Sequence, residues 1–240
     1  MSHAVSRLRS TRLARSTKPF LARGGNAQRC EGCRLPTVYC MCSMRRNVPS
    51  RAGMCLLMAD IEPIKPSNTG WLIADVVPDT FAFSWARTEV DPAFLQLLAD
   101  PQWQPYVVFP AEFVDTSRVV HAVDDTSHKR PLFILLDGTW AEARKMFRKS
   151  PYLNHLPIIS LHPDQISRYR LRRSSREDHF CTAEVAALCL ELAQDTQASH
   201  MLNAYLDVYS ERYLLAKRNR VLPSTTVAHA HLQSLIGAAK

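Results

Sequence analysis

The residues best suited to chemistry are Asp137, Gly138, Thr139 and Trp140, which directly follow an apolar run at 132–136. The run is typical of a buried strand, and the basic stretch behind the tetrapeptide indicates a helix. In parallel α/β sheets, ligands bind beyond the carboxyl ends of strands, so this turn would present a carboxylate, a hydroxyl and an indole to a substrate. The structural alternative is a helix N-cap at Asp137 or Thr139 with a buried Trp140.

A second polar group, Asp60, Glu62 and Asn68, follows the apolar run 54–59. If 54–59 is a neighbouring strand, these side chains lie at the same sheet edge as the first group. Two interpretations remain open: Glu62 and Asn68 orient a ligand, or Asn68 and Thr69 cap a helix.

Four cysteines lie within thirteen residues, as a C-x-x-C pair and a C-x-C pair. Four thiolates at such spacing suit a tetrahedral zinc ion, and the surrounding segment has little hydrophobic material to fold without one. The alternatives are unliganded thiols or a redox pair. The predicted metal ligands are Cys30, Cys33, Cys40 and Cys42. The remaining cysteines, expected to be buried small hydrophobes, are Cys55, Cys181 and Cys189.

The charge of the chain favours a polyanionic partner. Its formal net charge is +8 and its isoelectric point about 9.3, which is typical of nucleic-acid binding. Five arginines and a tyrosine fall within 167–176, where they suit phosphate contacts and base stacking, although a solvated basic loop is the alternative. The residues expected to contact RNA are Arg144, Lys145, Arg168, Tyr169, Arg172 and Arg173.

Short apolar strands alternate with helices, which predicts an α/β fold with a mostly parallel sheet covered on both faces. The 240 residues suffice for one domain and an appendage. Strands are expected at 54–59, 80–85, 106–109, 132–136 and 157–161, and helices at about 69–77, 91–99, 141–149, 185–192 and 202–213. We divide the chain into a basic arm (1–29), a cysteine segment (30–49), a catalytic domain (50–216) and a C-terminal tail (217–240).

Several classes of protein are excluded by missing motifs. The seven glycines form no dinucleotide-binding or P-loop signature, and the zinc-protease and nucleophile-elbow motifs are also missing. No apolar run approaches the roughly 20 residues of a membrane span, and no apolar region of a secretory signal follows the basic N-terminus. We therefore expect a cytoplasmic protein, with a mitochondrial presequence at 7–23 as the alternative.

Taken together, these motifs resemble the DTW-domain family. The cysteine cluster, KPSNTG at 65–70, Phe109-Pro110, the DGTW turn with ARKMFRKSPYL behind it, and 169–172 followed by CTAEVA occur in that family's order. The similarity runs from about residue 7 to residue 213 and is greatest to bacterial tRNA-uridine 3-amino-3-carboxypropyltransferases. Many members carry His-Pro before the position of Glu62, where this chain has Asp60-Ile61, so no catalytic histidine is expected there.

The resemblance implies a SPOUT-like fold with a knotted cofactor site. It also implies S-adenosylmethionine as donor of an aminocarboxypropyl group, N3 of uridine 47 in the tRNA variable loop as acceptor, methylthioadenosine as by-product, and structural zinc. On this basis Asp137 is the base or orients the uracil, Thr139 belongs to the catalytic turn, and Trp140 packs on a base or on adenine. The predicted cofactor residues are Phe109, Pro110, Asp137, Gly138, Leu161, Leu171, Thr182 and Glu184.

Three other functions fit parts of the sequence. A SPOUT-type RNA methyltransferase would use the same donor but transfer the methyl group. A non-enzymatic zinc-containing RNA-binding protein would use Asp137 only structurally. A metal-dependent hydrolase built on Asp60, Glu62 and Asp137 fits poorly, because no histidine or further acid lies at ligand spacing nearby. The partner expected is tRNA, with no membrane, and the sequence leaves monomer and homodimer open.

Overall fold

The sheet of this protein is parallel throughout. The computed structural model describes residues 3–18, 20, 27–124, 126, 128–161 and 181–238. Within these residues, six strands form one sheet in the order β2-β1-β5-β3-β6-β4, and every neighbouring pair is parallel. The strands are β1 (Gly53–Met58), β2 (Thr80–Ser84), β3 (Trp103–Val108), β4 (Val119–Val120), β5 (Arg130–Asp137) and β6 (Ile158–Ile159). The predicted α/β class is confirmed, whereas the knotted cofactor site stays a prediction.

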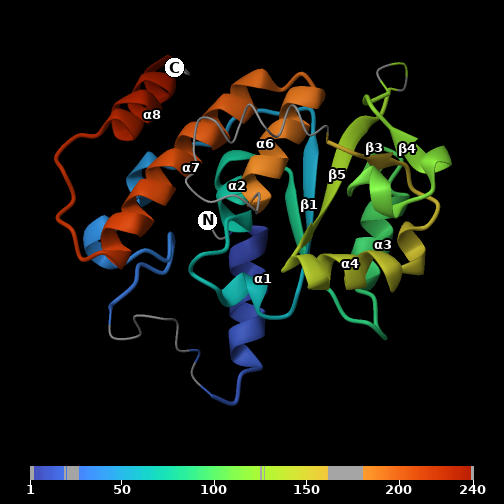
Figure 1. Ribbon diagram of the computed structural model, residues 1–240, viewed down its shortest axis with the longest axis horizontal. Helices are drawn as coiled ribbons and strands as arrows, with labels where there is room; N and C mark the ends of the chain where they lie inside the picture. Colours follow the sequence, from blue (N-terminus) through green and yellow to red (C-terminus); the bar gives the residue numbers. More distant parts are fainter. Residues whose placement is uncertain are drawn as a thin grey trace.

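Helices cover both faces of the sheet (Figure 1). One layer contains α1 (Ala4–Ala14), α2 (Gly70–Val76), α6 (Thr182–Leu192) and α7 (Thr196–Lys217), and the other contains α3 (Pro92–Ala99) and α4 (Trp140–Arg148). Successive strand residues serve opposite layers because side chains alternate along a strand. Thus Met54 and Leu56 pack with the first layer, while Cys55 packs with the second.

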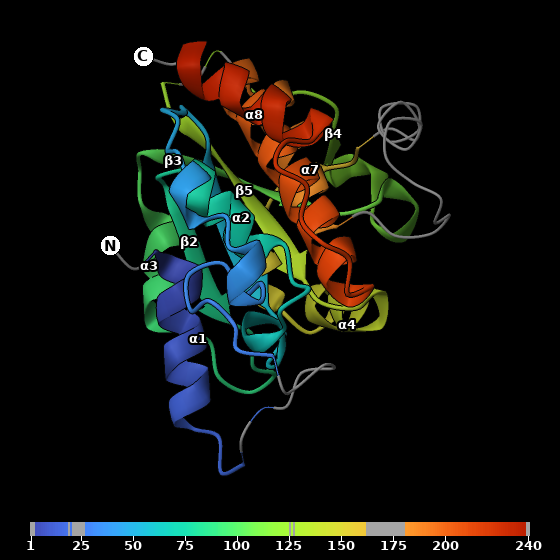
Figure 2. The same cartoon turned by 90° about the vertical axis from the view of Figure 1, so that its left-hand side faces the viewer.

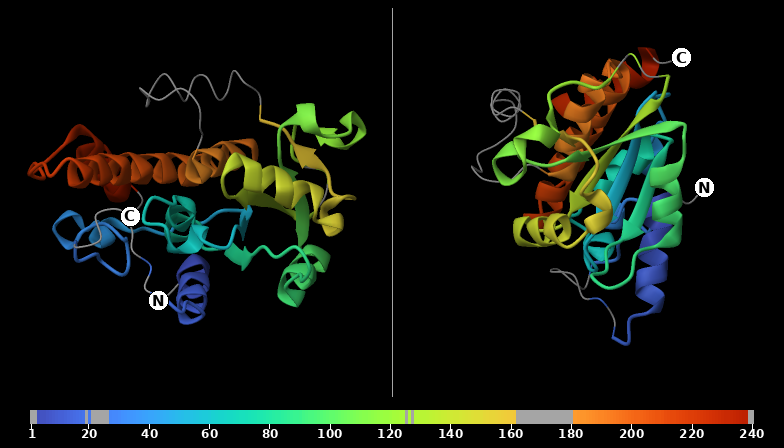
Figure 3. Two further views of the ribbon diagram at one scale, coloured as in Figure 1. Left: turned by 60° about the horizontal axis from the view of Figure 1, so that its bottom comes forward. Right: turned by 90° about the vertical axis from the view of Figure 1, so that its right-hand side faces the viewer.

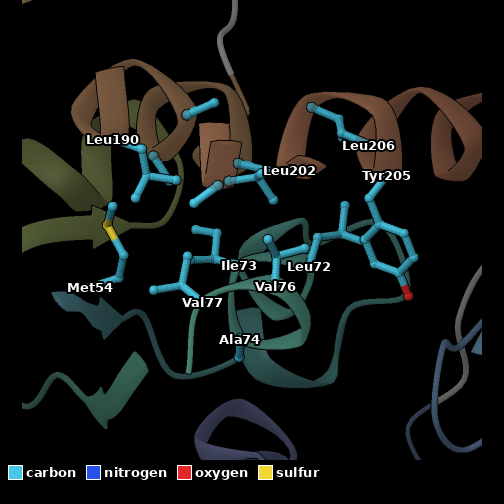
Figure 4. Packing of buried hydrophobic residues seen from close by; sticks show 14 of the residues in the cluster. Met54, Leu72, Ile73, Ala74, Val76, Val77, Leu190, Leu202, Tyr205 and Leu206 are labelled. Atoms are coloured by element: carbon cyan, nitrogen blue, oxygen red, sulfur yellow. The ribbon is translucent and has the colours of Figure 1, made fainter. Parts of the chain in front are cut away.

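Helix α2 is the most enclosed helix among the described parts of the chain, since all seven of its residues are buried. It lies between α7 and α1 (Figure 3). Figure 4 shows Leu72, Ile73 and Val76 of α2 facing Leu202 and Leu206 of α7. This packing holds the loop that leads into α2, and therefore the polar residues at 62–69, in a fixed place beside the sheet edge.

The central position of β5 decides where the site forms. β5 lies between β1 and β3, and its last residue, Asp137, is in register with Met58 at the end of β1. Both strands therefore deliver their following residues to one edge of the sheet. The apolar run predicted this strand at 132–136, and the observed strand is longer at both ends.

Both ends of the chain carry helices within the described residues. Much of the predicted basic arm is helix α1, which buries Val5 and is tied to the sheet edge by a bidentate ion pair between Arg12 and Asp60. The predicted tail contains α8 (Val227–Ala238), which packs against α7 through Leu232 (Figure 2). None of the helices in the described ranges is both long and apolar enough to span a membrane.

Candidate functional site

A buried carboxylate, Asp137, is the centre of the candidate site. Its side chain receives hydrogen bonds on both oxygens: Asn68 Nδ2 donates to Oδ2 at 2.8 Å and Thr182 Oγ1 donates to Oδ1 at 2.6 Å. Only 3% of Asp137 is exposed. Three separate elements, the end of β5, the loop before α2 and the first turn of α6, therefore meet at one carboxylate.

The amide of Asn68 links two acids. Its Oδ1 accepts a hydrogen bond from Gly70 N at 2.9 Å, which fixes Nδ2 as the group facing the carboxylates. Nδ2 then bridges Asp137 and Glu62, with Glu62 Oε2 at 3.2 Å, and Lys65 pairs with Glu62 from the other side. Asn68 thus positions the two acids, and its amide oxygen stabilises the start of α2, whose N-cap Thr69 forms no side-chain capping bond. That Glu62 and Asn68 orient a ligand stays a prediction.

Two glycines permit the close packing around Asp137. A Cβ on Gly70 would lie 2.9 Å from Asp137 Oδ2 and 3.1 Å from Asn68 Oδ1. A Cβ on Gly138 would lie 3.0 Å from both Glu142 Cβ and Met146 Cε. Real Cβ atoms do not come within 2.9 Å of a non-bonded atom, so a side chain at Gly70 would displace the acid. A side chain at Gly138 would require Glu142 or Met146 to move by a few tenths of an ångström.

The environment raises the pKa of Asp137 to about 6. Burial is the main cause, because it disfavours the charged form, and the nearby charge of Glu62 acts in the same direction. The hydrogen bonds from Thr182 and Asn68, and the charge of Lys65, lower the pKa and oppose this shift. A carboxylate with a pKa near the working pH is suited to accepting a proton during a reaction.

Thr139 and Trp140 begin helix α4 in different roles. Thr139 is the N-cap of a capping box, in which its Oγ1 accepts from Glu142 N and Glu142 Oε2 accepts from Thr139 N at 2.8 Å. Its hydroxyl also donates to Glu142 Oε2 at 2.6 Å. The cap is thus Thr139 and not Asp137. Trp140 is not buried as the structural alternative supposed, because 42% of it is exposed, and it stacks on Phe109 with ring centroids 5.5 Å apart.

The structure brings only some of the predicted cofactor residues together. Thr182 and Gly138 adjoin Asp137, while Phe109 follows β3 and Leu161 lies just beyond β6. Pro110 precedes the short 3-10 helix η4 (Ala111–Phe113), and Glu184 caps α6 by accepting from Cys181 N at 2.9 Å. Outside the described residues lie the predicted residues Arg168, Tyr169, Leu171, Arg172 and Arg173.

The four clustered cysteines are arranged as zinc ligands would be. Their sulfur atoms all lie within 4.8 Å of one another, and Cys30 Sγ is 3.6 Å from Cys42 Sγ and 3.5 Å from Cys40 Sγ. Zn–S bonds of about 2.3 Å in a tetrahedron separate the sulfurs by roughly 3.8 Å, so the donor set fits the metal. A Cβ on Gly32 would lie 2.8 Å from Cys42 Sγ, so the turn requires glycine.

The cysteine segment is better anchored than its composition suggested. The expectation of little hydrophobic material was wrong, because the segment adds several side chains to the main core: Leu35, Met41, Met44 and Val48. Arg45 also pairs with the buried carboxylate of Asp75, which accepts a hydrogen bond from Tyr205. Of the other cysteines, Cys55 and Cys189 are fully buried as predicted, and Cys181 is half-buried.

The sequence did not identify two aromatic residues that lie beside the predicted site residues Phe109 and Arg144: Phe113 and Phe147. Phe147 stacks face to face on Phe109 at 4.2 Å, and Phe113 carries the guanidinium of Arg144 over its ring at 4.9 Å. Phe147 falls seven residues after Trp140, so helical spacing was an available signal. Phe113 lies on a different element, η4, so no helical spacing relates it to Trp140.

The DTW domain model matches residues 27–214, so the chain belongs to the DTW-domain family. The chain is 27% identical over 175 residues to tRNA-uridine aminocarboxypropyltransferase 2 of Drosophila melanogaster. That match covers 69% of this chain and 66% of the relative, just under two thirds of the relative's length. No solved structure gives a significant match.

Proposed function

We propose that the protein transfers the 3-amino-3-carboxypropyl group of S-adenosylmethionine to N3 of a uridine in tRNA, at position 47 of the variable loop. Family membership and the activity for which the fly relative is named support this class of reaction. The structural observation that carries it is Asp137, a buried carboxylate held by Asn68 and Thr182 at the carboxyl edge of a parallel sheet, with its pKa near 6.

The reaction assigns Asp137 a proton-accepting role. Uridine N3–H is a weak acid, so its proton passes to Asp137 as the nitrogen attacks the carbon beside the sulfonium. The N–C bond forms, the C–S bond breaks, and its electron pair converts the positive sulfur into the neutral thioether of methylthioadenosine. General-base help of this kind typically contributes about 10²–10⁴-fold, and in-line alignment contributes further.

The surroundings of Asp137 supply positioning. Thr182 and Asn68 fix the carboxylate, while Trp140 offers an exposed ring against which a base or the adenine packs. Phe109, Pro110 and Leu161 follow neighbouring strands, and we place the adenosyl pocket along them. The four clustered cysteines would hold one structural zinc ion, which would fix the segment that packs on α7.

The pH dependence of transfer should move in opposite directions in two variants. Asp137 must be ionised to accept a proton, so wild-type activity rises with pH through about 6 and then levels off. Glu62→Gln removes a charge that raises the pKa of Asp137 and should move the acid limb to lower pH. Thr182→Val removes a hydrogen bond that lowers the pKa and should move the limb to higher pH.

These shifts are measured as the single-turnover rate constant against pH, with saturating enzyme and donor. A merely structural role for Glu62 and Thr182 would lower the plateau without moving the midpoint. Identical midpoints in wild type and both variants would therefore count against a proton-accepting Asp137.

Binding of tRNA should depend steeply on salt. We propose that RNA binds to the basic face of α4 and to the arginine-rich stretch at 167–176. On α4, Lys145 lies over the ring of Trp85 at 5.7 Å. Each phosphate contact adds roughly 0.7–0.9 to the slope of log affinity against log salt. We expect Lys145→Met to reduce the measured slope by about 1, and Lys217→Met, at the far end of α7, to leave it unchanged. A tRNA affinity that does not vary with salt would contradict RNA binding through these basic residues.

The direct test is incubation of the purified protein with tRNA and S-adenosylmethionine labelled in the carboxyl carbon. Label retained in a uridine nucleoside, with methylthioadenosine released, supports the proposal. A methylated nucleoside without label, with S-adenosylhomocysteine released, would instead assign an RNA methyltransferase. Absence of any modification would favour an RNA-binding protein without this activity.

A further inference from the structure

An aromatic surface with arginines lies beside the acidic centre. Helix α4 places Trp140, Arg144, Phe147 and Arg148 on one face, since residues four, seven and eight apart lie on the same side of a helix. Phe113, from η4, faces this side of α4, with its ring 5.4 Å from that of Trp140. We call these five residues together with Phe109 the aromatic platform.

Phe109 is the support of the platform and not its contact surface. Its ring stacks on Phe147 at 4.2 Å and 5° and on Trp140 at 5.5 Å and 17°, and Phe109 itself is buried. Trp140 and Phe113, by contrast, remain 42% and 40% exposed. The ring faces that a ligand can reach therefore belong to Trp140 and Phe113.

A hollow of about 180 Å³ opens in this surface. Among the described residues it is lined by Phe109, Phe113, Arg144, Phe147 and Arg148, so these walls are aromatic and carry two guanidinium groups. Arg144 already lies over the ring of Phe113 at 4.9 Å. Since none of these lining residues is acidic, the hollow favours a flat ligand that carries negative charge.

Core packing does not account for this arrangement. Two large aromatic side chains that served only the core would be enclosed, whereas these two stay exposed next to cations. Aromatic rings that stack on bases, with arginines that meet phosphates, are how proteins hold single-stranded nucleic acid. A lipid surface would need a larger apolar patch, and an acidic peptide offers no flat ring for Phe113.

We propose that the hollow holds a second nucleobase of the RNA, next to the acceptor uridine, stacked on Phe113 with its phosphates on Arg144 and Arg148. This inference rests on RNA being the substrate. Arg144 and Arg148 lie about 6 and 12 Å along α4 from Trp140, so the hollow is beside the Asp137 centre and not over it. The hollow then selects RNA whose neighbouring base is unstacked, and Phe113, Arg144 and Arg148 take no part in the chemical step.

The test compares the affinity of an unmodified tRNA transcript for three variants. Phe113→Ala removes the stacking ring, and Arg144→Lys keeps the charge but loses the guanidinium plane. Leu95→Ala, at an exposed apolar residue of α3, is the matched control. We expect Phe113→Ala to weaken tRNA binding about tenfold, at the lower end of what one base stack is worth, and Arg144→Lys to weaken it less. Leu95→Ala should have no effect.

Two further readouts separate this proposal from its alternatives. A transcript carrying 2-aminopurine beside the acceptor uridine should lose fluorescence on binding wild type, and Phe113→Ala should abolish that quenching. Binding of S-adenosylmethionine should be unchanged by Phe113→Ala. A tenfold loss of donor affinity would instead assign the hollow to the adenosyl group and overturn the proposal.

Failure of the inference is distinguishable from failure of the proposed function. If wild type transfers the group but Phe113→Ala binds tRNA within twofold of wild type, the platform proposal is wrong and the function stands. If wild type binds and quenches the labelled RNA without transferring anything, the function is wrong and the platform stands. If wild type does not bind tRNA, both are wrong.

Discussion

Replacing Asp137 with asparagine should reduce transfer by at least 10²-fold while leaving tRNA and donor affinity nearly intact. The substitution keeps the shape of the side chain but removes the proton acceptor, whose loss alone is typically worth about 10²–10⁴-fold. Because Asp137 would meet the RNA only at the uracil, and the proposed phosphate contacts lie on other residues, we expect little change in how RNA docks. The measurements are the single-turnover rate and the two binding affinities.

A second variant separates chemistry from folding. An asparagine at 137 keeps both partners, because its oxygen accepts from Asn68 and its amide donates to the hydroxyl of Thr182, which is an acceptor as well as a donor. Thr182→Val is the matched variant, since it removes the hydrogen bond on Oδ1 but leaves the carboxylate in place. If Asp137→Asn unfolds at the wild-type temperature and is inactive, while Thr182→Val retains transfer, the proton-accepting role is supported. Retained turnover in Asp137→Asn would contradict it.

Removing the metal ligands should destabilise the whole chain and not only the cysteine segment. Cys33→Ser combined with Cys40→Ser leaves two thiols, which do not satisfy a tetrahedral zinc site. Metal binding energy counts as folding energy, and each kcal/mol lost lowers Tm by roughly 2–4 °C at this chain length. We expect the bound zinc to disappear and Tm to fall by about 10 °C.

The reason for a global effect is the anchoring of the segment. Arg212 of α7 donates a hydrogen bond to the carbonyl of Cys40, and Leu35 and Met41 belong to the main core. Cys181→Ser is the control, since it removes a thiol outside the cluster at an N-cap where serine is favoured. A wild-type protein without bound metal, whose Tm is indifferent to chelators, would contradict the zinc assignment.

Five of the six strands in the described residues were predictable, because each of them is a short apolar run ended by a turn or a proline. The observed strands β1, β2 and β5 coincide with these apolar runs, and α3 begins at the predicted Asp91-Pro92 cap. The two-residue strand β4 has no periodicity to detect, and α8 lies in the segment that was expected to be a tail. The order of the strands depends on crossovers that local pattern does not encode.

The candidate site was predictable at its centre and less so around it. Asp137 stood out because a strand end followed by a capped helix is visible locally. The hydrogen bonds of Asn68 and Thr182 to Asp137 join residues 69 and 45 positions apart, and only the folded sheet edge brings them together. The sequence allows Thr139 to cap a helix, and the structure adds the capping box that Thr139 forms with Glu142.

Mass spectrometry of tRNA nucleosides, after incubation with carboxyl-labelled S-adenosylmethionine, tests the central claim most directly. Wild type and Asp137→Asn are compared side by side on one unmodified transcript. We predict a uridine nucleoside that carries the label, formed with an equal amount of methylthioadenosine by wild type and at least 10²-fold more slowly by the variant. Unlabelled methylated nucleoside, or equal rates from the two proteins, would contradict aminocarboxypropyl transfer centred on Asp137.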